Sequence, residues 1–174
     1  MIDSHVHIFP DSMLNDDSSL ARDPVYSALH GRDVKKAGMD DLVRHMDEHG
    51  IERSVAMGFA FESPDLCRVF NEGLMQSCLR FPGRVIPFAS MSPETPDPAL
   101  ELQRISKLGF RGVGEIAFYR DGFGAGKGEW LAEVLKAARE FNLLVCIHVN
   151  EPVGHNYPGK YPTDFGILYK AIHE

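Results

Sequence analysis

The stretch from residue 84 to residue 118 decides the fold class. Two apolar runs, "RVIPFAS" (84–90) and "FRGVGEIAF" (110–118), enclose the segment "DPALELQRISKLG" (97–109). In that segment Asp97 and Pro98 provide a helix N-cap and a first-turn proline, and Gly109 provides a C-terminal stop. A short buried strand, a helix of about three turns and a second buried strand therefore follow one another. This order is typical of two parallel strands joined by a helical crossover.

The same alternation of strand and helix extends to both sides of this stretch. Further apolar runs predict strands over residues 2–9, 51–59 and 142–149. Helical spacing of apolar residues predicts helices over residues 39–50, 66–81 and 130–141 and from residue 163 onward. Because a strand and a helix follow one another five times, we expect a parallel sheet, either open or closed into a barrel.

The spacing of these units favours the barrel. The predicted strands start near residues 2, 51, 84, 110 and 142. One unit therefore takes roughly 35 residues, and eight units would take about 280, close to a typical TIM barrel. We expect an α/β fold, a partial TIM-type (β/α)8 barrel with five parallel βα units present. Residues 1–174 would form a single domain that is C-terminally truncated, because "GILYKAIHE" (166–174) reads as a helix without a stop signal.

A sheet of five parallel strands has two open edges, here the strands over residues 2–9 and 142–149. Each edge carries unpaired backbone groups, and we expect apolar side chains such as Ile2, Val145 and Ile147 to be uncovered there. An exposed apolar surface favours association. We therefore expect either a longer protein or a homo-oligomer in which another subunit covers these edges.

Composition and charge exclude several classes of protein. Of the residues 44% are hydrophobic, and no apolar run approaches the roughly 18 residues of a membrane span. The N-terminus lacks a signal-peptide pattern, so we expect a cytoplasmic protein with no membrane partner. A net charge of -7 without a basic stripe disfavours nucleic acid. Cys67, Cys78 and Cys146 have no CxxC spacing and are expected to be reduced core residues.

Two histidines stand on the first predicted strand, in "DSHVHIFP" (3–10). Side chains alternate between the faces of a strand, so His5 and His7 share one face with Asp3, while Ser4, Val6 and Ile8 share the other. Two neutral imidazoles at this spacing are able to bind one metal ion. The alternative is a pair of surface histidines on an edge strand.

Two further polar residues lie late in apolar strands. Glu115 in "RGVGEIAFY" (111–119) is a carboxylate within an otherwise buried strand, which is unfavourable unless it is paired or bound to a metal. The alternative is a salt bridge to Arg111 or Arg120. His148 in "LLVCIHVNEP" (143–152) ends the fifth strand, and its alternative is a core histidine bonded to a carbonyl.

These residues together predict a metal site at the carboxyl ends of the strands, where parallel α/β folds place their functional groups. His5, His7, Glu115 and His148 make a nitrogen and oxygen ligand set. Such a set suits a divalent metal, zinc in the first place and manganese or iron as alternatives.

The same residues resemble the amidohydrolase superfamily of metal-dependent barrels, with His-x-His on the first strand, an acidic residue on the fourth and a histidine on the fifth. The stretches "DSHVHIFP" and "IHVNEPVGHNYPGK" (147–160) look most like its amidohydrolase-2 branch, and the resemblance covers essentially the whole chain. It implies that His5 and His7 bind one metal, that Glu115 replaces a carboxylated lysine, and that His148 is a further ligand. The family's histidine after strand six and aspartate after strand eight match no residue here.

The chemistry that this resemblance implies is Lewis-acid activation of water, with Glu115 and His148 as catalytic residues. Hydrolysis of a small carbonyl or carboxylate substrate is the first expectation, and relatives that decarboxylate use the same ligands. Two alternatives stay open. One is a barrel phosphoesterase or nuclease, because "GEIAFY" (114–119) resembles the glutamate strand of those nucleases. The other is a non-catalytic fragment.

Two long loops, over residues 10–36 and 150–162, leave the same end of the predicted sheet, and loops of this length are usually lids or substrate contacts. The second loop supplies the substrate-binding candidates Asn150, Glu151, His155, Tyr157 and Lys160. Two other motifs are set aside. The histidines of "HMDEH" (45–49) lie outside the apolar stripe of their helix, and "DGFGAGKGEW" (121–130) departs from the phosphate-loop pattern and is expected to be a flexible loop.

Overall fold

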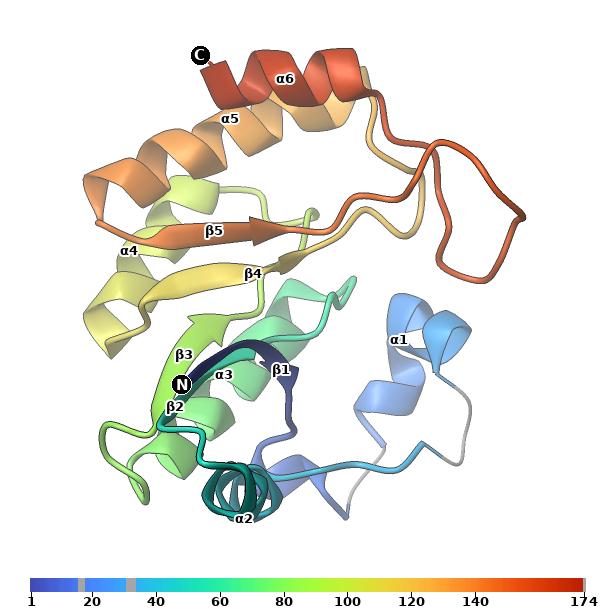
Figure 1. Ribbon diagram of the computed structural model, residues 1–174. Coiled ribbons are helices and arrows are strands. Elements are labelled where there is room, and N and C mark those ends of the chain that lie inside the picture. Colours follow the sequence, from blue (N-terminus) through green and yellow to red (C-terminus); the bar gives the residue numbers. More distant parts are fainter. Residues whose placement is uncertain (16–17, 31–33, 174) are drawn as a thin grey trace.

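A computed structural model describes residues 1–15, 18–30 and 34–173, and its centre is a five-stranded parallel sheet (Figure 1). The strands stand side by side in chain order. They are β1 (Ile2–His7), β2 (Arg53–Met57), β3 (Val85–Ala89), β4 (Gly112–Ile116) and β5 (Leu144–Ile147). All neighbouring strands are parallel. The sheet curls like half of a barrel, so the predicted α/β fold, a partial TIM-type barrel of five βα units, is confirmed.

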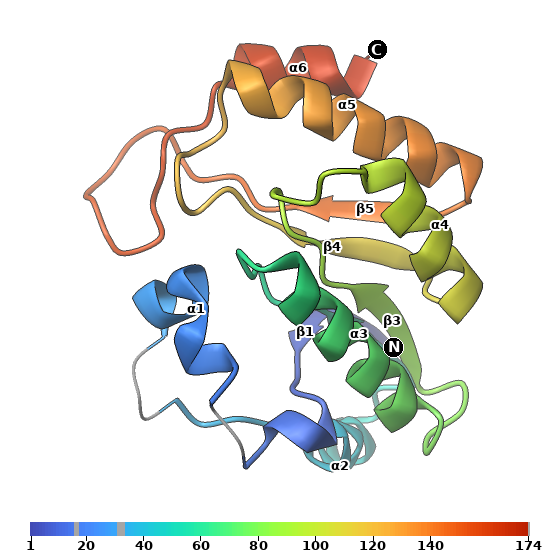
Figure 2. The ribbon, with the colours of Figure 1, turned by 180° about the vertical axis from the view of Figure 1, so that it is seen from behind.

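Helices cover the outer face of the curled sheet, as Figure 2 shows for α3, α4 and α5. The α-helices are α1 (Pro24–Leu29), α2 (Met39–His49), α3 (Pro64–Cys78), α4 (Pro98–Leu108), α5 (Ala125–Glu140) and α6 (Phe165–His173). Two short 3-10 helices, η1 (Asp11–Met13) and η2 (Leu20–Arg22), precede α1. Among the described residues, no helix is long and apolar enough to cross a membrane.

The helix ends follow the signals in the sequence. The Asp97 carboxylate accepts a hydrogen bond from the backbone N–H of Leu100 at 2.9 Å, which caps α4. At the other end of α4, Gly109 has a φ of 96° and forms the left-handed cap that glycine favours. Gly50 ends α2 in the same way. These caps fix where each crossover returns to the sheet.

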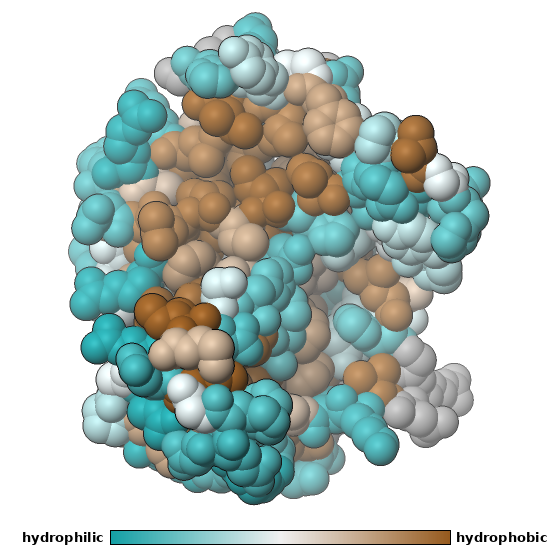
Figure 3. Space-filling view, in the orientation of Figure 1, coloured by the Kyte–Doolittle hydropathy of each residue, from teal (hydrophilic) through white to brown (hydrophobic). Residues whose placement is uncertain are grey.

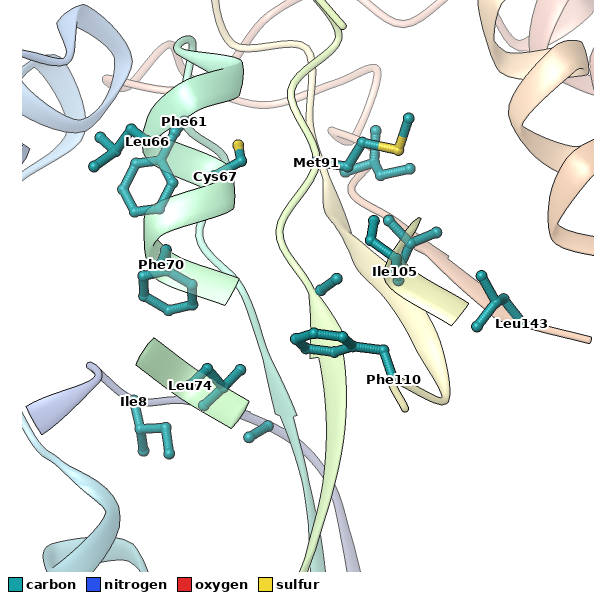
Figure 4. Packing of buried hydrophobic residues seen from close by; sticks show 14 of the residues in the cluster. Ile8, Phe61, Leu66, Cys67, Phe70, Leu74, Met91, Ile105, Phe110 and Leu143 are labelled. Carbon is teal, nitrogen blue, oxygen red and sulfur yellow. The ribbon is translucent and has the colours of Figure 1, made fainter. Parts of the chain in front are cut away.

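The hydrophobic core lies between the outer face of the sheet and the helices. Phe70 and Leu74 of α3 are wholly buried, as are Leu102 and Ile105 of α4. Figure 4 shows Phe70, Leu74 and Ile105 beside the strands, with Ile8 and Phe110 near them. Burying one such side chain contributes about 1.5–3 kcal/mol. The spacing of apolar residues in the sequence predicted this stripe on α3 correctly.

The side chains of β5 divide differently from our expectation. Val145 and Ile147 are partly buried and pack against the core, so the prediction that they are uncovered was wrong. Alternation then places Cys146 on the inner face of the sheet, where its Cβ and carbonyl lie against Gly114, so Cys146 is not a core residue. Cys67 is buried, and all three cysteines are free.

The open edges do expose apolar side chains, and the predicted Ile2 is one of them. Ile2 of β1 is 57% exposed and Leu144 of β5 is 66% exposed. Figure 3 shows apolar residues gathered over α5, α6 and β5 on the face that Figure 1 presents. Tyr169 and Ile172 of α6 belong to this exposed set.

Helix α5 begins earlier than the sequence predicted, at Ala125 rather than Trp130, so most of "DGFGAGKGEW" is helical and not a flexible loop. Two glycines in its first turns hide the helical pattern, because glycine is a poor helix former. Gly128 has a packing reason, since a Cβ there would lie 2.6 Å from Cγ2 of Ile167 in α6. The glycine therefore lets α6 approach α5 closely.

The segment between β1 and α2 is also more structured than the predicted long loop over residues 10–36. Within its described part, Met13, Leu20 and Tyr26 are buried, and α1 begins with an Asp23 cap and Pro24. The pair Asp23 and Pro24 is the same start signal that marks α4 at Asp97 and Pro98. It was missed because α1 is too short for an apolar period to show.

Just after β2 ends, the chain forms backbone hydrogen bonds directly with β4. Asn71 of α3 binds both backbone groups of Ser90, so β3 ends at Ala89 and turns toward the helix. Gly58 then reaches past it to β4: its N–H donates to the Gly114 carbonyl at 2.9 Å, and the Glu115 N–H donates to the Gly58 carbonyl at 3.3 Å. A Cβ on Gly58 would lie 2.5 Å from the backbone N of Ser90, so only glycine fits.

We predict that Gly58→Ala destabilises the fold by at least about 1–3 kcal/mol, because backbone must move to make room for the methyl group. Gly126→Ala is the matched control. Nothing lies within 4 Å of a Cβ there, and the exposed helical position should gain about 0.5–1 kcal/mol. Urea unfolding of both variants measures the two free energies. Equal effects of the two substitutions would contradict the close approach at Gly58.

Candidate metal centre

Three predicted ligands meet at the carboxyl end of the sheet. Nε2 of His5 lies 3.0 Å from Nε2 of His7. Oε2 of Glu115 lies 3.6 Å from Nε2 of His5 and 3.4 Å from Nε2 of His7. Two ligands of a tetrahedral zinc ion, each bound at about 2.0–2.1 Å, are roughly 3.3 Å apart. The three atoms therefore have the chemistry and the spacing that one divalent ion requires.

Strand β1 presents both imidazoles at this point despite an irregular register between Asp3 and Val6. Oδ1 of Asp3 accepts a hydrogen bond from the backbone N–H of His5 at 3.2 Å and so supports the irregular stretch. The ring of His7 lies 5.0 Å from that of Phe59. Nε2 of His7 is the nitrogen turned toward Glu115. Its Nδ1 is buried without a hydrogen-bond partner in the described part of the chain.

Glu115 is paired with histidines rather than with an arginine. Hydrogen bonds to His148 and His7 hold the pKa of its carboxyl well below the ordinary value, and they outweigh the opposite effect of burial. Of the two arginines considered from the sequence, Arg120 pairs with Glu62 instead. The Glu115 side chain is 18% exposed and ionised, which is the state that a metal ligand needs.

His148 lies one hydrogen bond behind the three ligand atoms. Its Nδ1 is 2.8 Å from Oε1 of Glu115, and its Nε2 is 3.1 Å from Nδ2 of Asn150. Oδ1 of Asn150 accepts from the backbone N–H of Tyr161, so its Nδ2 must donate to His148. Nδ1 of His148 therefore carries the proton and donates it to Glu115. In this arrangement His148 orients the carboxylate, and its role as a direct ligand stays a prediction.

A pocket of about 250 Å³ opens beside His7 and Glu115. Aromatic rings make up most of its wall. It is lined by His7, Tyr26, Leu29, His30, Phe59, Ala60, Glu115 and Tyr119. Sequence reasoning missed Tyr26, His30, Phe59 and Tyr119 as site residues. The available signal was position, since Phe59 and Tyr119 follow strands and His30 lies in the segment predicted to contact substrate.

Two pocket residues are shifted in pKa. Burial, followed by the negative charge of Glu115, raises the pKa of Tyr119 to about 12. Burial, followed by repulsion from His7, lowers the pKa of His30. At neutral pH, Tyr119 is therefore a phenol that can donate a hydrogen bond, and His30 is a neutral imidazole.

The substrate-binding candidates on the loop after β5 bond mainly to one another. The Tyr157 hydroxyl donates to Glu151 at 2.9 Å, and Nζ of Lys160 lies 3.2 Å from the same carboxylate. Lys160 also donates to the carbonyl of His155. Asn150 is buried against His148, and none of the five candidates lines the pocket within the described ranges. The loop packs behind the pocket wall at Gly159, where a Cβ would lie 2.6 Å from Cδ2 of Leu29.

The comparisons with known proteins agree with the fold. The amidohydrolase-2 family model, described as amidohydrolase, matches residues 2–166. The chain therefore belongs to the amidohydrolase-2 family. No curated protein matches the sequence.

Solved structures with the same fold include three enzymes. 5-Carboxyvanillate decarboxylase LigW from Sphingomonas paucimobilis is 18% identical, with a TM-score of 0.61 over 85% of this chain and 51% of that one. The 5-carboxyvanillate decarboxylase from Novosphingobium aromaticivorans, complexed with manganese and 4-hydroxy-3-methoxy-5-nitrobenzoic acid, is 17% identical, with a TM-score of 0.59 over 84% of this chain and 49% of that one. A probable 2-pyrone-4,6-dicarboxylic acid hydrolase from Acinetobacter baumannii is 20% identical, with a TM-score of 0.55 over 85% of this chain and 49% of that one. This chain thus spans about half the length of each.

We predict that His5→Asn combined with His7→Asn abolishes stoichiometric binding of Zn²⁺ or Mn²⁺, because two of the three converging ligand atoms are lost. Elemental analysis after equilibration with the metal measures the occupancy, and far-UV circular dichroism should stay nearly unchanged. The matched control replaces His45 and His49, whose exposed rings lie 4.2 Å apart on α2. Full metal occupancy in the His5 and His7 variant, or loss of metal in the control variant alone, would show that the metal site is not on β1.

Proposed function

We propose that the chain forms the metal-binding part of a hydrolase or decarboxylase that acts on a small carbonyl or carboxylate compound. The observation that carries the proposal is the convergence of His5, His7 and Glu115 within 4.8 Å at the carboxyl ends of β1 and β4. In barrels of this type, active sites lie at that end of the strands. Membership of the amidohydrolase-2 family, whose structural neighbours include hydrolases and decarboxylases, supports it.

Each residue has a distinct part in this proposal. The imidazoles of His5 and His7 and the carboxylate of Glu115 would hold a divalent ion, with zinc favoured by the ligand set and manganese supported by the structural neighbour that contains it. A bound ion would supply Lewis-acid activation of water and polarise the substrate oxygen. His148 keeps Glu115 ionised through the hydrogen bond from its Nδ1, with Oε2 left facing His5 and His7, and Asn150 fixes the tautomer of His148.

The pocket supports an uncharged or weakly anionic small molecule better than a phosphodiester. Besides His7 and Glu115, the residues with polar groups that line it are Tyr26, Tyr119 and His30. Neither lysine nor arginine lines it among the described residues, whereas phosphate recognition normally uses such cations. Hydroxyl and imidazole donors suit a carbonyl or carboxylate oxygen.

Location and assembly complete the proposal. Three free cysteines favour a reducing compartment such as the cytoplasm. The exposed Ile2 and Leu144 at the two sheet edges favour a homo-oligomer if this chain stands alone.

The proposed activity is tested with hydrolysable esters, amides and lactones, with aromatic and aliphatic carboxylic acids, and with phosphodiesters. We expect turnover of one of the first two groups that is weak for this chain alone, because no residue here matches the family's aspartate after strand eight. It should be lost on chelation, restored by Zn²⁺ or Mn²⁺, and reduced at least about tenfold in Glu115→Gln. Glu133→Gln on α5 is the matched control. Turnover of phosphodiesters alone would establish the phosphoesterase alternative, and activity that persists without metal would refute the proposal.

We predict that this chain alone associates in a concentration-dependent way, because its edge strands expose both backbone groups and apolar side chains. Light scattering measures the mass against 19.4 kDa for the monomer. Leu144→Lys should shift the balance toward the monomer, because a charge on an edge strand opposes pairing. Leu100→Lys, at an exposed apolar position on α4, should have no such effect. A monomer at all concentrations with full activity would refute the expectation.

A further inference from the structure

We infer that His30 is a substrate-contacting residue that determines specificity, because it lines the same pocket as the proposed ligands His7 and Glu115. The inference rests on the proposed function, because it takes the ligands on β1 and β4 as the reacting end of the site. It adds a residue of α1's C-terminal cap, outside the strands, to the groups that touch the substrate.

The position of His30 is defined by contacts on two sides. Its backbone N–H donates to the Tyr26 carbonyl at 2.9 Å and so closes α1. Its ring lies 4.6 Å from that of Tyr26 and meets the ring of Phe59 edge-on at 5.8 Å. These aromatic contacts hold the imidazole beside Tyr26 and Phe59, in the pocket that His7 and Glu115 also line.

The nitrogens of this imidazole are available to a ligand. Over residues 1–15, 18–30 and 34–173, no side-chain hydrogen bond is found for the His30 ring, although the ring is half-buried. A half-buried donor without a protein partner is satisfied by water or by a ligand. In its neutral form the ring offers one donor and one acceptor. His30 therefore supplies hydrogen bonding on a wall that is otherwise mostly aromatic.

The helix that carries His30 is fixed to the barrel by a buried carboxylate. Asp23 is 3% exposed, and its Oδ1 accepts the Tyr26 N–H at 2.9 Å. Its Oδ2 accepts the N–H groups of Glu62 and Ser63 at 2.9 and 3.0 Å, just before α3. One side chain thus joins the first turn of α1 to the loop after β2. Asp23 acts as a positioning residue for Tyr26 and His30 without touching the substrate.

The shape of the pocket indicates what His30 would contact. Tyr26, Phe59 and Tyr119 present aromatic rings, and the volume of about 250 Å³ suits a single small ring with substituents. A ligand whose carboxylate or carbonyl lies at the metal centre would turn its far edge toward α1. His30 then favours a ligand with an oxygen on that edge over the same ligand without it.

The test measures binding of benzoate and of its 2-, 3- and 4-hydroxy derivatives to the full chain equilibrated with Zn²⁺, by ligand-observed NMR titration. We expect at least one hydroxy isomer to bind about fivefold to tenfold more tightly than benzoate in the wild type. In His30→Phe, which keeps a ring against Tyr26 and Phe59, that preference should disappear while benzoate affinity stays within about twofold. His45→Phe, on the exposed face of α2, is the matched control and should keep the preference.

Asp23→Asn tests the positioning role, since its one amide oxygen can accept either the Tyr26 N–H or the N–H groups of Glu62 and Ser63, but not both sets. It should reduce the preference in the wild type and have no further effect in the His30→Phe background. His30→Gln, which restores a donor, should recover part of the preference. If Asp23→Asn does not fold, the His30 variants decide the outcome.

The outcomes separate the two proposals. A preference that survives His30→Phe, or no binding of any of the four acids to the metal-loaded wild type, overturns the role of His30 and leaves the metal centre intact. Failure of the chain to take up metal, measured by elemental analysis on the same samples, overturns the proposed function, and with it this inference.

Discussion

The candidate site depends on keeping one carboxylate ionised inside a half-buried layer of imidazoles. Glu115 stands in a strand whose other side chains are apolar, where an unpaired charge would be unfavourable. Hydrogen bonds to His148 and His7 lower its pKa and remove that conflict. The same bonds turn Oε2 toward β1, where His5 and His7 present their nitrogens. Ionisation, orientation and ligand geometry therefore arise from one set of contacts.

This set of contacts requires strands that approach unusually closely at their carboxyl ends. Gly58 bonds directly to the backbone of Gly114 and Glu115, and it does so because Asn71 pulls Ser90 out of the sheet toward α3. Gly114 in turn lies against Cys146 of β5. Glycine at positions 58 and 114 allows this close approach of the strands but contributes no side chain to the core. The core is instead formed at the outer face of the sheet, where Phe70, Leu74 and Ile105 of the helices are buried.

The sequence predicted the sheet well because two periodic signals were strong: short apolar runs for strands and capped amphipathic patterns for helices. It also brought His5, His7 and Glu115 together, since parallel strands align their carboxyl ends. It failed where tertiary contacts override local pattern. Gly128 of α5 makes room for the close approach of α6, and the helix α1 is too short to show a period. Cys146 was predicted to be a core residue because its neighbours Val145 and Ile147 are apolar. His30 was missed because its role depends on Asp23, a contact between distant segments.

The two walls of the pocket have different structural origins, and this separates the reaction from its specificity. The proposed metal ligands are carried by strands, whose positions are fixed by the hydrogen bonds of the sheet. Another part of the wall is carried by α1, which is held by the buried Asp23 and packs through Leu29 against Gly159 of the loop after β5. Changes in that wall leave the ligand geometry intact. On the proposed function, the ligand set on the strands can stay the same while the substrate changes through segments of this kind.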